Sequence, residues 1–178
     1  MRTKMVAIVG LMVLAGVPGA LAAQEEHPFQ VSLLSPIQAF PEEDAVRGLR
    51  LSILYGRNMD VTGVDIGLVS HVSRDFTGVQ WGLVGFVEGD ALGVQSNQFV
   101  NIVEGELEGV QIGALNMADR GQGLQLSLVS HARNFQGLQI GLVNYAETLK
   151  GIQIGLVNII RSGGVLPVMP LVNWSSGG

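Results

Sequence analysis

Glycine recurs through this 178-residue sequence at a nearly constant interval. Eight glycines stand 15, 15, 15, 16, 14, 14 and 14 residues apart, at Gly48, Gly63, Gly78, Gly93, Gly109, Gly123, Gly137 and Gly151. A fixed period of this length is typical of repeat proteins, in which each copy packs mainly against its two neighbours. Residues 48–164 are therefore expected to form stacked copies of one small unit.

The residues after each glycine alternate between apolar and polar side chains. The clearest copies read Gly-Leu-Gln-Ile-Gly-Leu-Val-Asn from Gly137 and Gly-Ile-Gln-Ile-Gly-Leu-Val-Asn from Gly151. Counting the glycine as position 0, positions 1, 3 and 5 are mostly apolar and position 2 is polar. Alternation with a period of two predicts a β-strand, and turn-forming residues precede the next glycine. The sequence thus predicts an all-β chain.

Two architectures are compatible with this template. One is a β-solenoid, a parallel β-roll or β-helix of about eight 14–16-residue rungs with N- and C-terminal caps, whose apolar positions stack into a continuous interior. The alternative is an up-and-down outer-membrane β-barrel, with the apolar positions facing lipid. The uniform spacing lacks a barrel's alternation of short turns and long loops, and aromatic residues make up only 6% of the chain, few for two interfacial girdles. These two features favour the solenoid.

Glutamine occupies position 2 in most repeats, and stacked rungs would align these side chains. A side-chain amide both donates and accepts, so glutamines one rung apart can bond along the axis. The predicted ladder comprises Gln80, Gln95, Gln111, Gln125, Gln139 and Gln153, with a second, partial row at Ser70, Asn101, Asn116, Ser130, Asn144 and Asn158. The favoured interpretation is structural, with the ladder holding the rungs in register. The alternative is a flat interaction face, which requires glutamines that face solvent.

The flanks differ from the array. Residues 1–23 have two cations, an apolar stretch and small residues at Ala20–Ala23, the layout of a secretory signal peptide. Residues 24–47 are expected to form an N-terminal cap segment and 165–178 a C-terminal cap and tail. Pro167 and Pro170 cannot donate to a strand ladder and so discourage further pairing.

Composition excludes several classes of function. The chain has no cysteine, so disulfides and thiolate chemistry are impossible. Its net charge is −5, and −7 without residues 1–23, which hold two cations and no acid, so neither nucleic-acid binding nor an electrostatic grip on anionic lipid is expected. His71 and His131 occupy equivalent places four rungs apart, roughly 19 Å at about 4.8 Å per rung, too far to share a metal ion. We therefore expect no enzyme, catalytic residue, metal or cofactor.

The units from Gly137 and Gly151, the entry Gly48–Asn58 and the exit Leu166–Trp174 resemble the bacterial surface-repeat proteins first noticed in spirochaete genomes. The resemblance implies an exported or lipid-anchored protein without an established activity, and it transfers no catalytic residue. The expected function is a scaffold or an interaction and adhesion module, and the alternative is an integral outer-membrane barrel protein. The expected location is the cell surface, outer membrane, extracellular space or periplasm. The expected partner is a protein or glycan of the envelope, with peripheral or integral outer-membrane association, for a monomer or small homo-oligomer.

Overall fold

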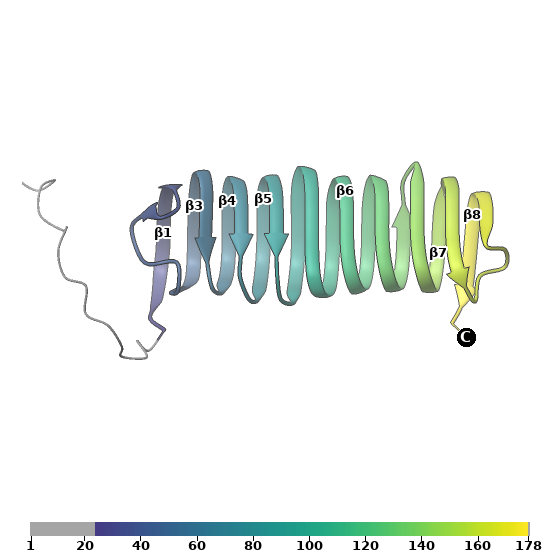
Figure 1. Ribbon diagram of the computed structural model, residues 1–178, viewed down its shortest axis with the longest axis horizontal. Coiled ribbons are helices and arrows are strands. Elements are labelled where there is room, and N and C mark those ends of the chain that lie inside the picture. The colour runs from purple at the N-terminus through teal and green to yellow at the C-terminus, as the bar shows by residue number, and fades with distance from the viewer. Residues whose placement is uncertain (1–23, 178) are drawn as a thin grey trace, which may run out of the picture.

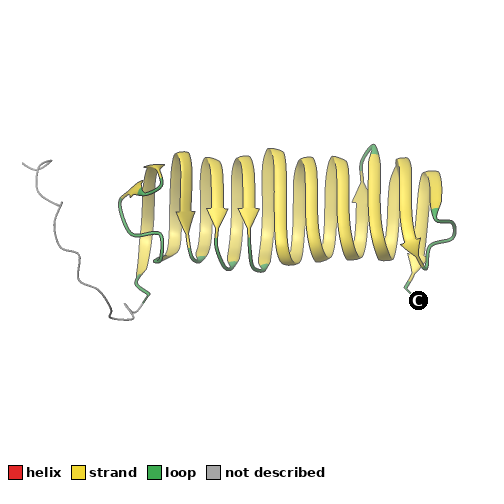
Figure 2. Ribbon diagram, in the orientation of Figure 1, coloured by secondary structure: helices red, strands yellow, loops and turns green. Residues whose placement is uncertain are grey.

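The fold is a β-solenoid, as the computed structural model shows for residues 24–177, which are the residues the structure describes. The chain winds into about nine stacked coils along one axis (Figure 1). Strand and loop account for all of the described residues in Figure 2. Residues 24–177 hold no helix long and apolar enough to cross a membrane. The predicted signal peptide, residues 1–23, lies outside the described residues.

Eight strands form one continuous sheet in the order β2-β1-β3-β4-β5-β6-β7-β8. Their bounds are β1 Glu26–Leu34, β2 Ile37–Gln38, β3 Ala45–Asn58, β4 Val61–Val72, β5 Phe76–Val87, β6 Ala91–Ile140, β7 Val143–Ser162 and β8 Val168–Ser176. Every pairing from β1 to β7 along the axis is parallel, and only the end pairs β1–β2 and β7–β8 are antiparallel. Parallel stacking confirms the solenoid and is incompatible with the up-and-down barrel.

The repeat glycines stack on one another at a corner of the coil. Gly63 pairs with Gly48 and Gly78, and Gly137 pairs with Gly151. All eight have φ between +125° and +148°, where L side chains are strained. A Cβ added at Gly137 would lie 2.1 Å from the carbonyl oxygen of Gly123. Both backbone conformation and close rung spacing therefore require glycine at position 0.

The apolar core fills only one half of the cross-section. It is built by two rows late in each repeat, whose members are Val46, Val61, Val72, Phe76, Val87, Ala91, Val103, Leu107, Ala118, Ala132, Phe135, Ala146, Leu149 and Ile160. Large and small side chains compensate between rungs: a Cβ at Gly121 would meet the Phe135 ring at 2.9 Å. This half of the solenoid is a conventional, close-packed interior.

The expectation that positions 1, 3 and 5 stack into the interior is wrong. Leu142, Ile152 and Ile154 expose more than 40% of their surfaces, whereas the glutamine between each pair of apolar neighbours is fully buried. The strand alternates as predicted, but with the opposite side facing inward. The half of the coil that follows position 0 is polar inside and apolar outside.

The flanks close the two ends in different ways. Strand β1 stacks in parallel register on β3, with Gln30 buried one rung before Arg50, so residues 26–34 form a further rung. The short β2 then folds back on β1. At the other end β8 reverses direction and pairs with β7, placing Asn173 opposite Gln153. The N-terminal segment thus extends the array, and β8 covers its last rung.

Replacing Gly137 by alanine should lower the free energy of unfolding by at least about 2 kcal/mol, because the new Cβ combines a positive φ with a backbone clash. The neighbouring Gln136→Ala, at an exposed position, is the matched control and should change stability by less than about 0.5 kcal/mol. Urea unfolding followed by circular dichroism measures both. Similar midpoints for the two variants would show that the glycine column does not set the stacking distance.

Candidate functional site

The six ladder glutamines lie inside the solenoid. Each exposes 1% or less of its surface. Nε2 of each glutamine after Gln80 donates to Oε1 of the glutamine one rung earlier, over 2.7–3.1 Å: Gln95 to Gln80, Gln111 to Gln95, Gln125 to Gln111, Gln139 to Gln125 and Gln153 to Gln139. The glutamines therefore form a hydrogen-bonded ladder, and their burial rules out the alternative of an interaction face.

A buried ion pair begins this ladder. Gln80 donates to Asp65 Oδ2 over 2.9 Å, and the Asp65 carboxylate also accepts two guanidinium hydrogen bonds from Arg50, at 2.7 and 2.8 Å. Both side chains are fully buried, and Arg50 also donates to the His71 carbonyl oxygen over 2.9 Å. A carboxylate accepts without donating, so it suits the end of a row whose amides all donate in one direction. Arg50 neutralises the charge that this ending introduces.

Asparagine and serine form the second internal row. Asn101, Asn116, Asn144 and Asn158 are fully buried, and their amides donate across rungs to side-chain or backbone oxygens. Asn101 Nδ2, for example, donates to Asn116 Oδ1 over 2.8 Å and to the Ile112 carbonyl oxygen over 2.9 Å. Most amides of this polar half are therefore hydrogen-bonded inside the solenoid, although the oxygens of Asn97 and Asn144 are buried without a partner among the described residues, and all of these amides are buried.

The outward positions of the same half form one surface, which we call the apolar face. It consists of template positions 1, 3, 5 and 6 in all eight repeats, thirty-two residues, of which none is charged, none is buried and only Ser96 and Gln98 are polar. Its most exposed members are Ile53, Leu54, Trp81, Phe99, Leu128, Leu142 and Leu156. At about 4.8 Å per rung the face is roughly 34 Å long.

The apolar face continues beyond the eight repeats at both ends. Phe29, Val31 and Leu33 extend it on β1, and Val172 and Trp174 extend it on β8. Eighteen large apolar side chains of the face expose 36% or more of their surfaces. Because a fully buried aliphatic side chain removes on the order of 100 Å² from water, these half-exposed side chains together present roughly 1,000 Å². The largest apolar patch on a typical monomer is about 300–600 Å². An exposed apolar surface of this size indicates that a binding partner or an apolar phase covers it.

A furrow runs along the apolar face where position 4 is small. One part of it is an open hollow of about 470 Å³, whose lining includes Gly67, Gly82, Ile66, Leu68 and Trp81. A second hollow of about 330 Å³ continues it past Trp81 to Ile112 and Leu128. At Gly82 a side chain would clash with the Gly67 carbonyl oxygen, 1.9 Å from the added Cβ. Close stacking of the rungs therefore requires glycine at this position, and the absence of a side chain there leaves the space of the furrow.

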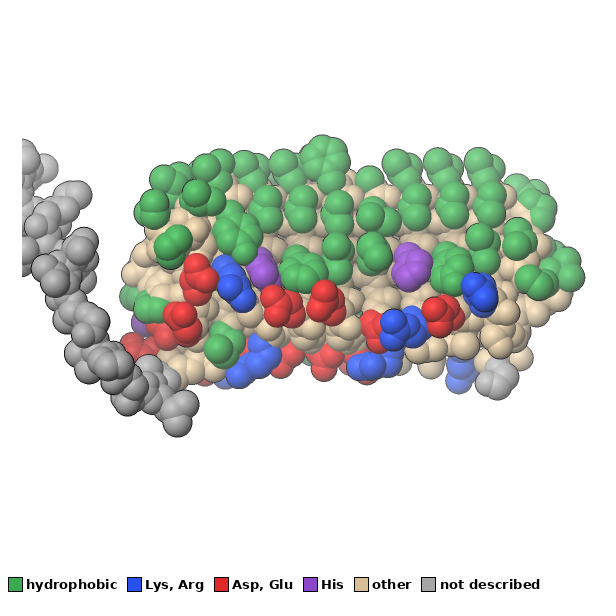
Figure 3. Space-filling model, in the orientation of Figure 1, with side chains coloured by type: hydrophobic (Ala, Val, Ile, Leu, Met, Phe, Trp, Pro, Cys, Tyr) green, Lys and Arg blue, Asp and Glu red, His purple; other side chains and the backbone are tan. Residues whose placement is uncertain are grey.

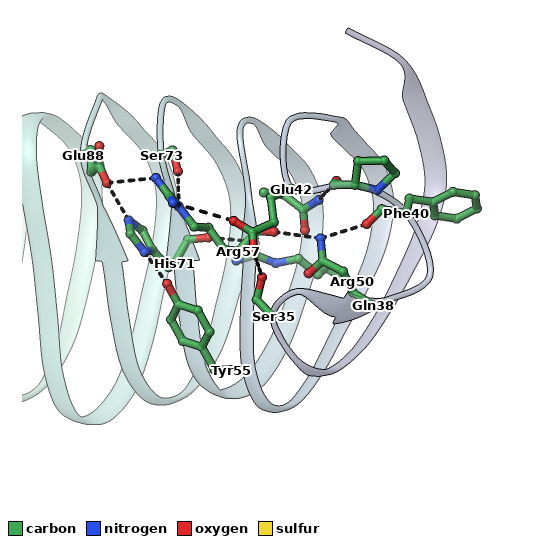
Figure 4. Close-up of polar contacts among 12 residues, drawn as sticks. Ser35, Gln38, Phe40, Glu42, Arg50, Tyr55, Arg57, His71, Ser73 and Glu88 are labelled. Carbon is green, nitrogen blue, oxygen red and sulfur yellow. Dashed lines mark hydrogen bonds and ion pairs between the residues drawn. The ribbon is translucent and has the colours of Figure 1, made fainter. Parts of the chain in front are cut away.

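A row of amphipathic side chains borders the apolar face. Residues stacked next to it, on the far side of the buried asparagine row, include His71, Phe86, His131 and Tyr145, all half-buried. His131 and Tyr145 stack with ring centroids 4.9 Å apart. Both ring nitrogens of His71 are hydrogen-bonded: Nδ1 lies 2.7 Å from the Tyr55 hydroxyl and Nε2 lies 2.7 Å from Glu88 Oε1 (Figure 4). Burial raises the pKa of the Tyr55 phenol. Both histidines are held within this row by their neighbours.

Charged residues gather in the turns on the opposite side from the apolar face (Figure 3). Several acids there bond the next rung: Asp60, Asp75 and Asp90 accept backbone N–H groups at 3.2, 3.0 and 2.7 Å. Burial alone would raise the pKa of the Asp60 carboxyl, but hydrogen bonds from Arg74, Gln24 and the Asp75 N–H lower it below its usual value. The acids of these turns therefore have a structural role in stacking.

One histidine lies among acids at the N-terminal end. The ligand atoms of Glu25, His27 and Asp44 lie within 4.8 Å of one another. His27 Nε2 is 3.0 Å from Asp44 Oδ2, its ring stacks on Phe40, and Asp44 Oδ1 accepts the Glu25 N–H. These contacts fasten β1 to the turn before β3.

Comparisons with family models, with curated proteins and with solved structures found no match to this chain. The resemblance to bacterial surface-repeat proteins therefore stays a prediction, and the functional argument depends on the surface itself. Sequence reasoning found the ladder but missed the apolar face. The missed signal was the absence of any charged residue from positions 1, 3, 5 and 6 across all eight repeats.

The Asp65→Gln variant should lose about 3–5 kcal/mol of unfolding free energy, because it leaves the Arg50 guanidinium buried without its counter-charge. The double variant Arg50→Gln/Asp65→Gln removes both charges and extends the amide ladder, so it should recover most of that loss. A double-mutant cycle from urea unfolding measures the coupling. Equal destabilisation of the single and double variants would contradict the assignment of this ion pair as the end of the ladder.

Proposed function

We propose that this chain is a non-enzymatic, exported interaction module of the bacterial cell envelope that docks through its apolar face. The observation that carries the proposal is the uninterrupted absence of charge from thirty-two outward positions along eight rungs. Apolar patches much larger than those of ordinary monomers mark interaction surfaces. The exposed charges of the repeats lie outside this face, where Figure 3 shows them in the turns, so the two sides of the rod suit different surroundings.

The distribution of polar groups supports a binding role over catalysis. The amides of the interior are buried and bonded to one another, out of reach of any ligand. The aspartates of the turns bond backbone groups of the next rung, and His71 is held at both ring nitrogens. The two hollows of the furrow are lined by aliphatic and aromatic side chains together with Ser52, Ser96, Asn97, Gln98 and Ser127, and none of the lining residues is titratable. An uncharged furrow suits docking and supplies no acid or base.

Export is the second part of the proposal and depends on residues 1–23, whose sequence predicts a signal peptide. A rod with an apolar side would associate non-specifically in a crowded cytoplasm. Delivery to the envelope places that side near its proposed partner.

The test is fractionation of a bacterial host that expresses the chain with its own leader. We expect the parent protein in the envelope fraction, resistant to a salt wash and released by detergent, because apolar contacts are not screened by ions. The variant Leu126→Glu/Leu128→Glu, with two charges on the apolar face, should move to the soluble fraction.

Gln122→Glu/Gln136→Glu is the matched control, since it adds the same two charges at exposed positions outside the apolar face. It should fractionate like the parent. If the parent, the face variant and the control distribute alike, docking through the apolar face is wrong. Circular dichroism of the purified variants establishes that both keep the fold.

A further inference from the structure

We propose that the occupant of the apolar face is a lipid bilayer, into one leaflet of which the face inserts with the solenoid axis parallel to the membrane surface. This inference rests on the proposed function and names its partner. Two other occupants are compatible with an apolar surface: a second copy of this chain, and an apolar protein of the envelope. Four features of the described residues favour lipid.

The first feature is the order of side-chain types around the coil. On one side of the apolar face the surface passes to the row that contains His71, Phe86, His131 and Tyr145, together with Arg57, Ile102, Met117 and Ile159, and then to the charged turns. Figure 3 shows this order, with histidine between the hydrophobic and charged zones. A membrane presents the same order with depth: hydrocarbon, a polar interface where aromatic and amphipathic side chains concentrate, and water. The cross-section therefore matches the profile of a leaflet.

The second feature is the lack of hydrogen-bonding groups on the face. Its backbone N–H and C=O groups are used in the rung-to-rung ladder, and Ser96 and Gln98 are its only polar side chains. Protein–protein interfaces carry about one hydrogen bond per 100–200 Å². Contact with hydrocarbon requires no hydrogen bonds. A bilayer tolerates a backbone only where its N–H and C=O groups are already hydrogen-bonded within the protein.

The third feature is the repeat itself. A second copy could slide along the face by one rung, about 4.8 Å, and meet nearly the same side chains again. The surface area, roughly 1,000 Å², would suffice for a dimer, for which about 800 Å² per partner is standard. Specific pairing, however, needs features that fix register, and a fluid leaflet needs none.

The fourth feature is the furrow. Its two hollows, about 470 and 330 Å³, share Trp81 and Gln98 in their lining and follow the small residues of position 4 along the axis. An extended acyl chain fits the first hollow best, because its lining is mostly glycine and apolar side chains with Ser52 and Gln98 as its polar residues, whereas the second hollow adds Ser96, Asn97 and Ser127. Acyl chains of the leaflet can therefore lie in the furrow, in contact with the protein surface.

The charge balance predicts which lipids suffice. The turns that would face the headgroups and water carry more acids than cations, consistent with the negative net charge of the chain. Anionic headgroups would repel them. Binding should therefore occur on zwitterionic lipid, should not increase with anionic lipid and should not fall with salt, the reverse of a basic peripheral protein.

The chain carries its own probes for the test. Its two tryptophans, Trp81 and Trp174, both lie on the apolar face and are 60% and 47% exposed. The exported protein is purified and titrated with phosphatidylcholine vesicles. We expect the fluorescence to shift to shorter wavelength and to be quenched by bromine on the acyl chains. Vesicles that contain phosphatidylglycerol should bind no more tightly, and added salt should not release the protein.

The variants used for fractionation separate the outcomes. Leu126→Glu/Leu128→Glu should weaken partitioning at least about tenfold, and Gln122→Glu/Gln136→Glu less than about twofold, because only the first pair must enter hydrocarbon. If the glutamate pair fails to fold, Leu126→Ser/Leu128→Ser replaces it with the same direction of effect. Equal partitioning of the folded face variant and its control would overturn the lipid inference.

Failure of this inference differs from failure of the proposed function. If the protein ignores vesicles and forms a dimer that the face variant dissociates, as seen by light scattering, a second copy covers the face. If it ignores vesicles, is monomeric and still needs the face for envelope retention, the partner is a protein. Either result overturns the lipid inference and leaves docking through the apolar face intact, whereas loss of face-dependent retention overturns the proposed function itself.

Discussion

Every coil of this solenoid depends on the amide ladder at its centre. A side-chain amide taken out of water is stable only when its donor and acceptor both find partners, and here the four inner glutamines, Gln95 to Gln139, find both in the glutamines of the adjacent rungs. That arrangement works only for parallel strands in register. Extra residues are therefore taken up outside the ladder, as in the irregular stretches between Ser52 and Tyr55 and between Gly82 and Val84, and the glutamines stay stacked.

The ladder also has a direction, which its two ends make visible. All Nε2 groups point toward the N-terminal end, where the row meets the Asp65 carboxylate. At the other end Oε1 of Gln153 is buried without a hydrogen-bond partner among the described residues. Aligned amide dipoles place partial positive charge at the Asp65 end, so an anion is favourable there for the reason it is favourable at a helix N-terminus. Arg50 balances that anion and makes a buried charge tolerable at the start of the row.

The sequence predicted the repeat, the strands, the solenoid and the stacked glutamines, because these follow from spacing and from a period of two. It did not predict which side of the strand faces inward. The inference that Leu138, Ile140 and Leu142 line the interior used the ordinary preference of apolar side chains for burial. That preference is outweighed here because a second pair of apolar rows, such as Ala146 and Leu149 in the same repeat, already supplies the core. The absence of charge from positions 1, 3, 5 and 6 is visible in the sequence, but by itself it does not distinguish an outer face from a core row, because an ordinary core row is also uncharged.

Interior and surface are not independent in such a chain, because a strand that buries position 2 must expose positions 1 and 3. A continuous amide ladder inside therefore fixes continuous outward rows at positions 1 and 3 but leaves their polarity free, and an interruption of the ladder should appear in those rows. The 16-residue repeat from Gly93 has this property. Asn97 enters the interior and donates to Gln80 and Asn101, and the residues on either side of it, Ser96 and Gln98, are the only polar members of the apolar face. Phe99, 56% exposed, restores an apolar surface at that rung. The apolar character of the face is thus kept even where the internal pattern changes, which is the behaviour of a surface that serves a purpose of its own and is not merely a by-product of the ladder.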